Sequence, residues 1–153
     1  MKIPERISDW LIERAMRTPF SHIPGYMERY WLIPYQEGDR QQIAARIHHI
    51  LRSDNDREFH DHPWPYLTVL LRGSYTEVTP VYDRSGIFVE ERRVRYEQGS
   101  VLRRAAKSWH RLEVEPGQTV WTLFITGPYQ QRWGFMLNPA NKVYWRDLKR
   151  PLE

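Results

Sequence analysis

Two histidines separated by one residue, His60 and His62, constrain the fold of this chain more than any other feature. They precede the apolar run Tyr66–Leu71, and the whole segment is typical of a buried strand. Side chains alternate across a strand that rises about 3.3 Å per residue, so the two imidazoles share a face with roots roughly 6.6 Å apart. Two nitrogens at that spacing can converge on one metal ion, whereas Asp61 points the other way and is a poor ligand candidate.

A second segment is built like the first. It starts at a glycine turn, Gly99, and reaches a third histidine, His110, just before another strand pattern, while the first segment closes at Gly73. Together the two segments resemble the two motifs of the cupin superfamily. In that family three histidines, usually with a glutamate, hold a divalent metal inside a small antiparallel barrel. The resemblance therefore implies His60, His62 and His110 as metal ligands.

The chain departs from the family pattern at several positions. Tyr66 stands where the family commonly has its glutamate ligand, Ala105 and Lys107 replace a proline and a glycine, and Val114 replaces the closing asparagine. Three neutral histidines resemble the three-histidine cupins, which include thiol dioxygenases and diketone-cleaving dioxygenases. The segment His-Asp-His-Pro-Trp also resembles one carried by bacterial and phage-borne cupins. These likenesses imply a divalent metal, with Fe(II) favoured and zinc, nickel or manganese as alternatives.

Two residues near the histidines are candidate catalytic groups. Tyr66 has the same strand parity as His62, so its phenol could donate a hydrogen bond to bound substrate or dioxygen, or could simply line the wall. Glu77 follows the Gly73 turn, where parity no longer predicts the facing of a side chain, and it is a candidate replacement carboxylate ligand.

Candidate substrate-binding residues lie at the ends of the predicted strands. Arg72 and Arg104 could each clamp a carboxylate through two parallel hydrogen bonds, and Trp64 directly follows the histidine motif. His48 and His49 are adjacent on another predicted strand, so only one of them can face inward, as a substrate-facing group or as a hydrogen-bonded part of the wall.

The strand pattern predicts an all-β fold, a small antiparallel double-stranded β-helix of the jelly-roll type in one domain of 153 residues. A helix over Asp9–Arg17, capped by Ser8, is expected in a helical extension over residues 1–25. Its apolar residues, Trp10, Leu11 and Met16 among them, are expected to pack on the outside of the barrel. The barrel is expected over 26–136 and a tail over 137–153, with Thr119–Thr126 as the most central strand.

Composition limits the chemistry and the partners. The chain has no cysteine, which excludes disulfides, thiolate metal sites and the cysteine–tyrosine crosslink found in some thiol dioxygenases. Its net charge of +4 comes from 23 basic and 19 acidic residues that are interspersed, so nucleic acid is not an expected partner. Since no apolar run approaches a membrane span, we expect a soluble cytoplasmic protein that binds a small molecule, with a homodimer left open.

The leading functional hypothesis is a non-haem Fe(II) dioxygenase that acts on a small chelating organic substrate. Two other classes stay open at this stage. The barrel could be a non-catalytic metal-binding or ligand-binding module, or it could resemble the sugar-nucleotide isomerases and epimerases of cupin type, in which a histidine acts as general base without metal.

Overall fold

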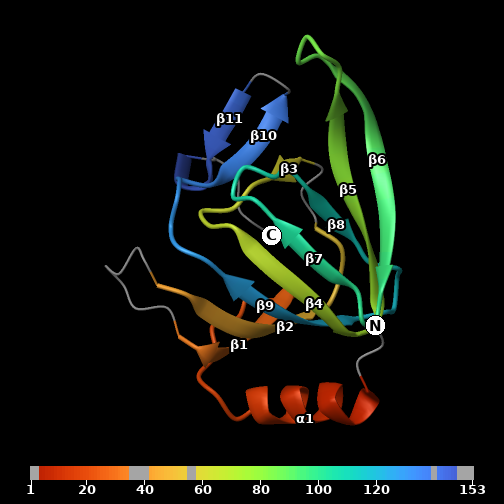
Figure 1. Ribbon diagram of the computed structural model, residues 1–153, viewed down its shortest axis with the longest axis vertical. Coiled ribbons are helices and arrows are strands. Elements are labelled where there is room, and N and C mark those ends of the chain that lie inside the picture. Colours follow the sequence, from red (N-terminus) through yellow and green to blue (C-terminus); the bar gives the residue numbers. More distant parts are fainter. Residues whose placement is uncertain (1–3, 35–41, 55–57, 139–140, 148–153) are drawn as a thin grey trace.

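The computed structural model describes residues 4–34, 42–54, 58–138 and 141–147, which form one N-terminal helix and three antiparallel sheets (Figure 1). The elements are α1 (Glu5–Ala15), β1 (Met27–Ile33), β2 (Ala44–Ile50), β3 (Phe59–His60), β4 (Tyr66–Arg72), β5 (Ser74–Tyr82), β6 (Phe88–Glu97), β7 (Val101–Arg104), β8 (Arg111–Glu113), β9 (Val120–Thr126), β10 (Gly134–Asn138), β11 (Asn141–Tyr144) and the 3-10 turn η1 (Trp145–Asp147). The predicted all-β class with a short N-terminal helix is confirmed.

The largest sheet has the strand order β1-β2-β9-β4-β7. Its middle strand is β9, as the almost continuous apolar character of Thr119–Thr126 predicted, because a central strand is covered on both faces. The two smaller sheets have the orders β6-β5-β8 and β11-β10-β3; in the view of Figure 1, β10 and β11 lie above the large sheet, and β5 and β6 rise along its right-hand side.

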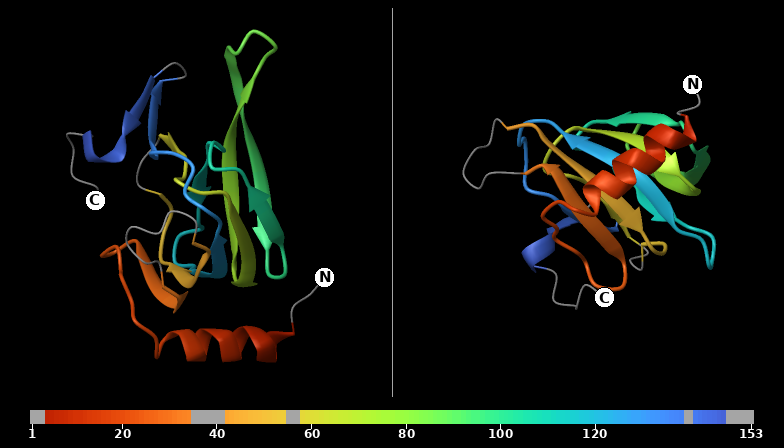
Figure 2. Two further views of the ribbon diagram at one scale, coloured as in Figure 1. Left: turned by 60° about the vertical axis from the view of Figure 1, so that its left-hand side comes forward. Right: turned by 90° about the horizontal axis from the view of Figure 1, so that it is seen from below.

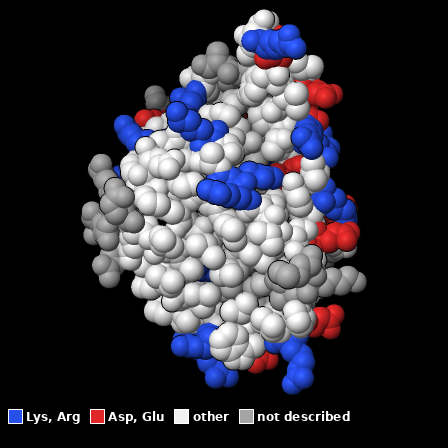
Figure 3. All heavy atoms as spheres, viewed as in Figure 1, with Lys and Arg blue, Asp and Glu red and all other residues white. Residues whose placement is uncertain are grey.

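The hairpin of β5 and β6 follows from its turn sequence. Asp83 accepts hydrogen bonds at its Oδ1 from the backbone N–H groups of Ser85, at 2.8 Å, and Ile87, at 2.9 Å. An aspartate that bonds its own turn in this way stabilises the reversal of the chain. On the face shown in Figure 3, basic and acidic side chains lie next to one another along this hairpin, and Glu91, for example, pairs with both Arg93 and Arg111.

The outer face of the large sheet is covered by α1, which crosses beneath it (Figure 2). Ile12 and Ala15 of the helix pack against Ile47, Leu71 and Trp121 of the sheet. Apolar side chains three residues apart lie on one side of a helix, so this contact stabilises the helix by burial more than by its own propensity.

The helix differs from its prediction in two respects. It begins at Glu5, so Ser8 lies inside it and is buried instead of capping it. The face that packs on the sheet is also turned: Trp10 and Met16 are exposed, whereas Ile12 and Ala15 are buried, and only Leu11 of the three expected residues packs against the core. No helix in the described part of the chain combines the length and the apolar character that crossing a bilayer requires.

The inner face of the sheet is apolar at one end and polar at the other. Ile50, Leu70, Leu102 and Val120 form the apolar end with Tyr75 of β5. Further along the same strands the inward positions carry buried polar side chains, which are Arg46, His48, Tyr66, Thr68, Thr122 and Thr126. The polar end of the barrel is therefore where a functional site can lie.

The strand expected to carry both His60 and His62 is interrupted. β3 ends at His60, and β4 starts only at Tyr66. Pro63 and Pro65 lie between the two strands, and neither can donate to a strand ladder. His62 thus lies in a connection between strands, and the prediction that His60 and His62 belong to one continuous strand was wrong.

Glycines with a positive φ occupy two turns with different surroundings. Gly73, between β4 and β5, has a φ of 81°, and a Cβ atom added there would lie 2.5 Å from the carbonyl oxygen of Thr119. Gly86, in the turn between β5 and β6, has a φ of 78°, and a Cβ atom there would meet nothing within 4 Å. Glycine at position 73 therefore permits both the positive φ of the turn and the close approach of the chain just before β9.

We expect Gly73→Ala to lower the free energy of unfolding by roughly 3 kcal/mol and Gly86→Ala by about 1 kcal/mol, because both pay backbone strain but only the first also clashes with backbone atoms. Urea denaturation followed by tryptophan fluorescence measures both values. Equal losses in the two variants would show that the approach of Thr119 does not constrain this corner.

Candidate metal centre

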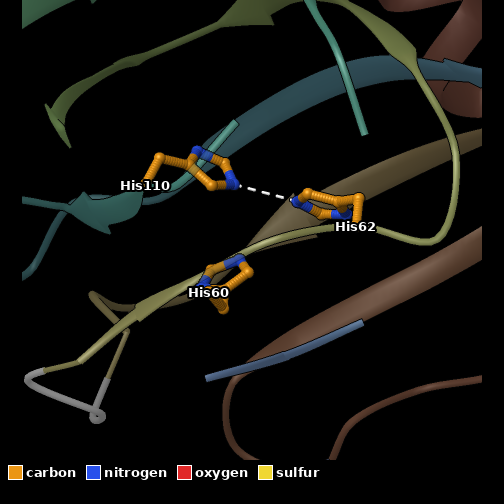
Figure 4. A group of neighbouring side chains, drawn as sticks. All are labelled: His60, His62 and His110. Carbon is orange, nitrogen blue, oxygen red and sulfur yellow. Dashed lines mark hydrogen bonds between the residues drawn. The ribbon is translucent and has the colours of Figure 1, made fainter. Parts of the chain in front are cut away.

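Three imidazole rings meet at the polar end of the barrel (Figure 4). One ring nitrogen from each of His60, His62 and His110 lies within 4.8 Å of the other two, and the Nε2 atoms of His62 and His110 are 2.9 Å apart. Two nitrogens that bind one ion at about 2.0–2.1 Å and at right angles lie roughly 3 Å apart. The cluster therefore fits a single divalent metal, which the predicted ligand set requires.

The backbone brings the third histidine to the pair. His60 and His110 form an isolated antiparallel bridge, in which the N–H of His60 donates to the carbonyl of His110 at 2.9 Å and the N–H of His110 donates back at 3.0 Å. The N–H of His62 donates to the carbonyl of Ala106 at 3.0 Å, in the turn that precedes His110. Both segments of the motif are thus held together by main-chain hydrogen bonds.

Asp61 points away from the three histidines, as its position between them predicted. It is 2% exposed, and its carboxylate accepts hydrogen bonds from the N–H of Gly134, the Nε2 of Gln131 and the Nζ of Lys142. A buried carboxylate with three such partners is satisfied without a metal. Its contribution is to hold the histidine segment in place.

Gln131 is a positioning residue that sequence reasoning missed. Its Nε2 donates to Asp61 and also to the carbonyls of His62 and Ala106, both at 3.0 Å. One amide group therefore ties the loop of His62 to the loop that leads to His110. No local pattern signals this role, because the residue lies in the connection after β9, far along the chain from its partners.

Carboxylates lie behind two of the histidines. The Nδ1 of His110 is 3.1 Å from Oε1 of Glu77, and that carboxylate also pairs with the guanidinium of Arg104. The Nδ1 of His60 is 3.8 Å from Oδ2 of Asp54. Metal-binding histidines commonly have such a partner on the second nitrogen, which fixes the ring and its tautomer.

Glu77 is therefore placed to orient His110. Its carboxylate is not part of the candidate ligand group found among the described residues, which consists of the three histidines. Burial raises the pKa of Glu77, but the hydrogen bonds from His110 and Arg104 outweigh burial and lower that pKa to about 2. The side chain is hence an anion at neutral pH.

The imidazoles have the charge state that metal binding needs. Burial lowers the pKa of His60 to about 4, and burial together with the neighbouring histidines lowers the pKa of His62 well below its usual range. Neutral imidazoles are the form that binds metal, so these two rings do not have to lose a proton first.

Tyr66 lies beside the cluster, as its expected role requires. Its hydroxyl is 3.2 Å from Nε2 of His110, and its ring centroid is 4.5 Å from that of His62. Burial raises the pKa of Tyr66 well above 10, so the phenol keeps its proton and can act as a hydrogen-bond donor.

The three candidate substrate-binding residues lie in different places. Trp64 is near the cluster, with its ring 6.1 Å from that of His62. Arg104 is on the inner face but is already paired with Glu77. Arg72 is an incorrect assignment: its side chain is 55% exposed and pairs with Asp9 of α1, because the bulge after Leu70 leaves it on the helix side of the sheet.

A pocket of about 540 Å³ is lined in part by the Glu77–Arg104 pair. It lies against the β5–β6 hairpin and includes Tyr96 and Trp109 in its wall, but none of the three histidines lines it. The pocket and the histidine cluster thus both adjoin Glu77.

His48 and His49 face opposite ways, as alternation predicted. His48 is buried on the inner face, where its ring stacks on Phe124 at 4.7 Å. His49 lies on the helix side, where its ring stacks on Trp121 at 3.9 Å and its Nδ1 is 2.8 Å from Glu28.

Comparison with known proteins gives structural matches only. No protein-family profile and no curated protein sequence matches the chain. The polyketide cyclase RemF from Streptomyces resistomycificus aligns with a TM-score of 0.61 and 16% identity, over 81% of this chain and 83% of that chain. An RmlC-like cupin from Ralstonia eutropha JMP134 aligns with a TM-score of 0.54 and 12% identity, over 82% and 71% of the two chains.

A third structure is hydroxypropylphosphonic acid epoxidase from S. wedmorenis, with a TM-score of 0.54 and 10% identity over 73% of this chain and 56% of that chain. The same epoxidase is also known in an Fe(II) form. At such low identities the likeness concerns the fold alone.

The low pKa of Glu77 predicts an acid-dependent stability. The contribution of this carboxylate is complete above the unfolded-state value of 4.5 and is lost as the pH falls toward about 2, where it becomes protonated in the folded state. We expect Glu77→Gln to be less stable than wild type at pH 7 and the difference to shrink between pH 4.5 and pH 2. Urea denaturation across this pH range measures it, with Glu97→Gln, an exposed carboxylate on β6, as the control. A difference that does not change with pH would contradict the assignment.

Proposed function

Since the chain has the cupin fold and brings three histidines together at the polar end of its barrel, we propose that it is a non-haem Fe(II)-dependent dioxygenase acting on a small chelating organic substrate. The observation that carries the proposal is the convergence of three imidazole nitrogens within 4.8 Å, two of them on rings that burial keeps neutral.

The donor set supports iron without requiring it. Three neutral nitrogen ligands leave several coordination positions open and do not reduce the positive charge of a divalent ion, so a chelating anion is attracted to the centre. Fe(II) bound there would supply open positions for substrate and dioxygen and a redox-active centre. The existence of an Fe(II) form of the epoxidase with a similar fold supports this choice of metal.

The chain's own residues have distinct tasks in this proposal. The Glu77 carboxylate keeps the Nδ1 proton of His110, so that the Nε2 atom of this ring faces the other two histidines. Tyr66, whose hydroxyl lies 3.2 Å from Nε2 of His110, would donate a hydrogen bond to an oxygen atom of a substrate held beside that ring. Trp64 and Phe124 flank His62 with apolar rings, which limits the access of water.

Metal analysis tests the centre. We expect protein purified without chelators to hold about one equivalent of metal, and we expect His60→Ala, His62→Ala and His110→Ala each to lose most of it, because two imidazoles bind much more weakly than three. Inductively coupled plasma mass spectrometry identifies and counts the metal. His49→Ala is the matched control, since this histidine lies on the other face of the sheet and should leave the metal content unchanged.

Equal metal content in wild type and in all three variants would remove the proposed centre. Stoichiometric zinc, with no activity restored by iron, would leave a metal-binding protein and contradict the oxygenase.

Oxygen uptake tests the reaction. We expect the iron-loaded protein to consume oxygen with a member of a panel of small 1,3-dicarbonyls, thiols and aromatic acids. We expect Tyr66→Phe to lower kcat about 10- to 100-fold at unchanged iron content, since it removes one hydrogen-bond donor next to the reacting atoms. An oxygen electrode measures the rate. Tyr30→Phe, on the helix side of the large sheet, is the control, and an unchanged kcat in Tyr66→Phe would remove the role of this phenol.

A further inference from the structure

One cation on the inner face of the barrel, Arg46, has no anionic partner among the residues that the structure describes. Arg46 is 8% exposed, and among the described residues no carboxylate lies within ion-pair distance of its guanidinium. Its Nε atom is buried without a hydrogen-bond partner. A buried charge is costly unless it is paired, so an unpaired guanidinium in the interior is suited to bind an anion.

Aromatic rings hold this guanidinium in place. Its Cζ atom lies 5.0 Å from the ring centre of Trp31, 5.5 Å from that of Trp64 and 5.2 Å from that of Phe124. Ring faces attract a cation, but they do not satisfy its N–H groups, which still need an acceptor. The rings thus fix the position of the guanidinium and leave its N–H groups available to donate hydrogen bonds.

The charges around Arg46 increase the need for an anion. Burial lowers the pKa of Arg46, and the positive charge of Arg29 lowers it further, to about 9. The side chain therefore remains mostly protonated at neutral pH. Paired arginines such as Arg104 and Arg111, in contrast, have a carboxylate directly on the guanidinium.

Arg46 lies next to the candidate metal centre. The rings of Trp64 and Phe124, which contact its guanidinium, also flank His62, with ring centres at 6.1 Å and 5.9 Å. The cross-strand neighbours of Arg46 point to the same interior, because Arg46 pairs in register with Phe124, and Phe124 with Thr68. The guanidinium and His62 therefore share two aromatic neighbours on the same interior face.

Two further buried polar atoms beside Arg46 lack partners. They are Nε2 of His48 and Oγ1 of Thr122. These two residues face each other across β2 and β9, and His48 is the next inward-facing residue after Arg46 on β2. Most buried polar atoms of a native structure find a hydrogen-bond partner in protein, water or ligand. Three such atoms on one interior face indicate a polar occupant there.

We propose that Arg46 binds a carboxylate of the substrate, so that the substrate is an organic acid with two separate groups: a chelating pair of oxygens at the three histidines and a carboxylate on the Arg46 guanidinium. This assignment names the substrate class of the proposed oxygenase site and rests on that function for the chelating end. The carboxylate end rests on Arg46 and its aromatic neighbours alone.

The test compares two probes that share the chelating group and differ at the far end, where one carries a carboxylate and the other its neutral ester. The first is 4,6-dioxoheptanoate, a 1,3-diketone with a carboxylate, and the second is its methyl ester, which has the same chelating group without the charge. We expect iron-loaded protein, kept free of oxygen, to bind the acid at least about tenfold more tightly than the ester in isothermal titration calorimetry, because hydrogen bonds to a charged group exceed this factor.

Variants of Arg46 test whether this residue causes the tighter binding of the acid. We expect Arg46→Met to abolish the preference for the acid while leaving metal content and ester affinity unchanged, and Arg46→Lys to restore only part of it, since lysine lacks the planar fork. Arg72→Met, which removes an exposed arginine on the helix side of the sheet, should keep the full preference. Equal affinities of wild type for acid and ester, or a full preference in Arg46→Met, would overturn the assignment.

Titration of the metal-stripped protein separates the two proposals. If the metal centre is wrong but Arg46 binds anions, the acid still binds in preference to the ester, and Arg46→Met removes the difference. If Arg46 is wrong, both probes bind equally with or without metal, while the metal analysis of the histidine variants still reports on the centre. Thermal unfolding of the unliganded variants verifies folding, and removal of an unpaired buried charge is expected not to lower Tm.

Discussion

Two main-chain hydrogen bonds between His60 and His110 are the interaction on which the site depends. They join β3 to the beginning of β8 across fifty residues of sequence, and they belong to no regular strand pair. Because backbone bonds leave the side chains free, both imidazoles can face the same interior while the chain around them is held in register. His62 joins them through its own main-chain bond to Ala106, so all three rings are positioned by the backbone before any metal is considered.

Side chains that never enter the centre make this arrangement rigid. Asp61 and Gln131 tie the histidine loop to β10 and to the turn before His110, and Glu77 holds the far nitrogen of His110. Each of these polar groups is buried or half-buried and has its partners, which makes the network stabilising as well as orienting. A cluster of buried neutral imidazoles would be costly without such support.

The inner face divides the barrel into two regions with separate tasks. Aliphatic and aromatic residues at one end, with Ile50, Leu70 and Val120 almost fully buried, form the core that stabilises the fold. The other end carries the histidines, Tyr66 and the unpaired Arg46, and its polar atoms are only partly satisfied. Natural proteins accept such incomplete satisfaction mainly at functional sites, which is why the polar end supports both the metal centre and the bound anion that we propose.

Local pattern was sufficient for the parts of this protein that depend on nearest neighbours. Alternation and apolar runs predicted the strands and the central place of β9, and the two histidine motifs predicted the fold and the three residues that meet. The tertiary structure alone decided the rest. It placed Arg72 outside the barrel and Glu77 behind His110, and it brought Gln131 to the histidine loop, because these outcomes depend on a bulge, a corner and a contact between distant segments. Within the described part of the chain it also left Arg46 without a carboxylate, since the sequence states which charges are present but only the fold determines which of them meet.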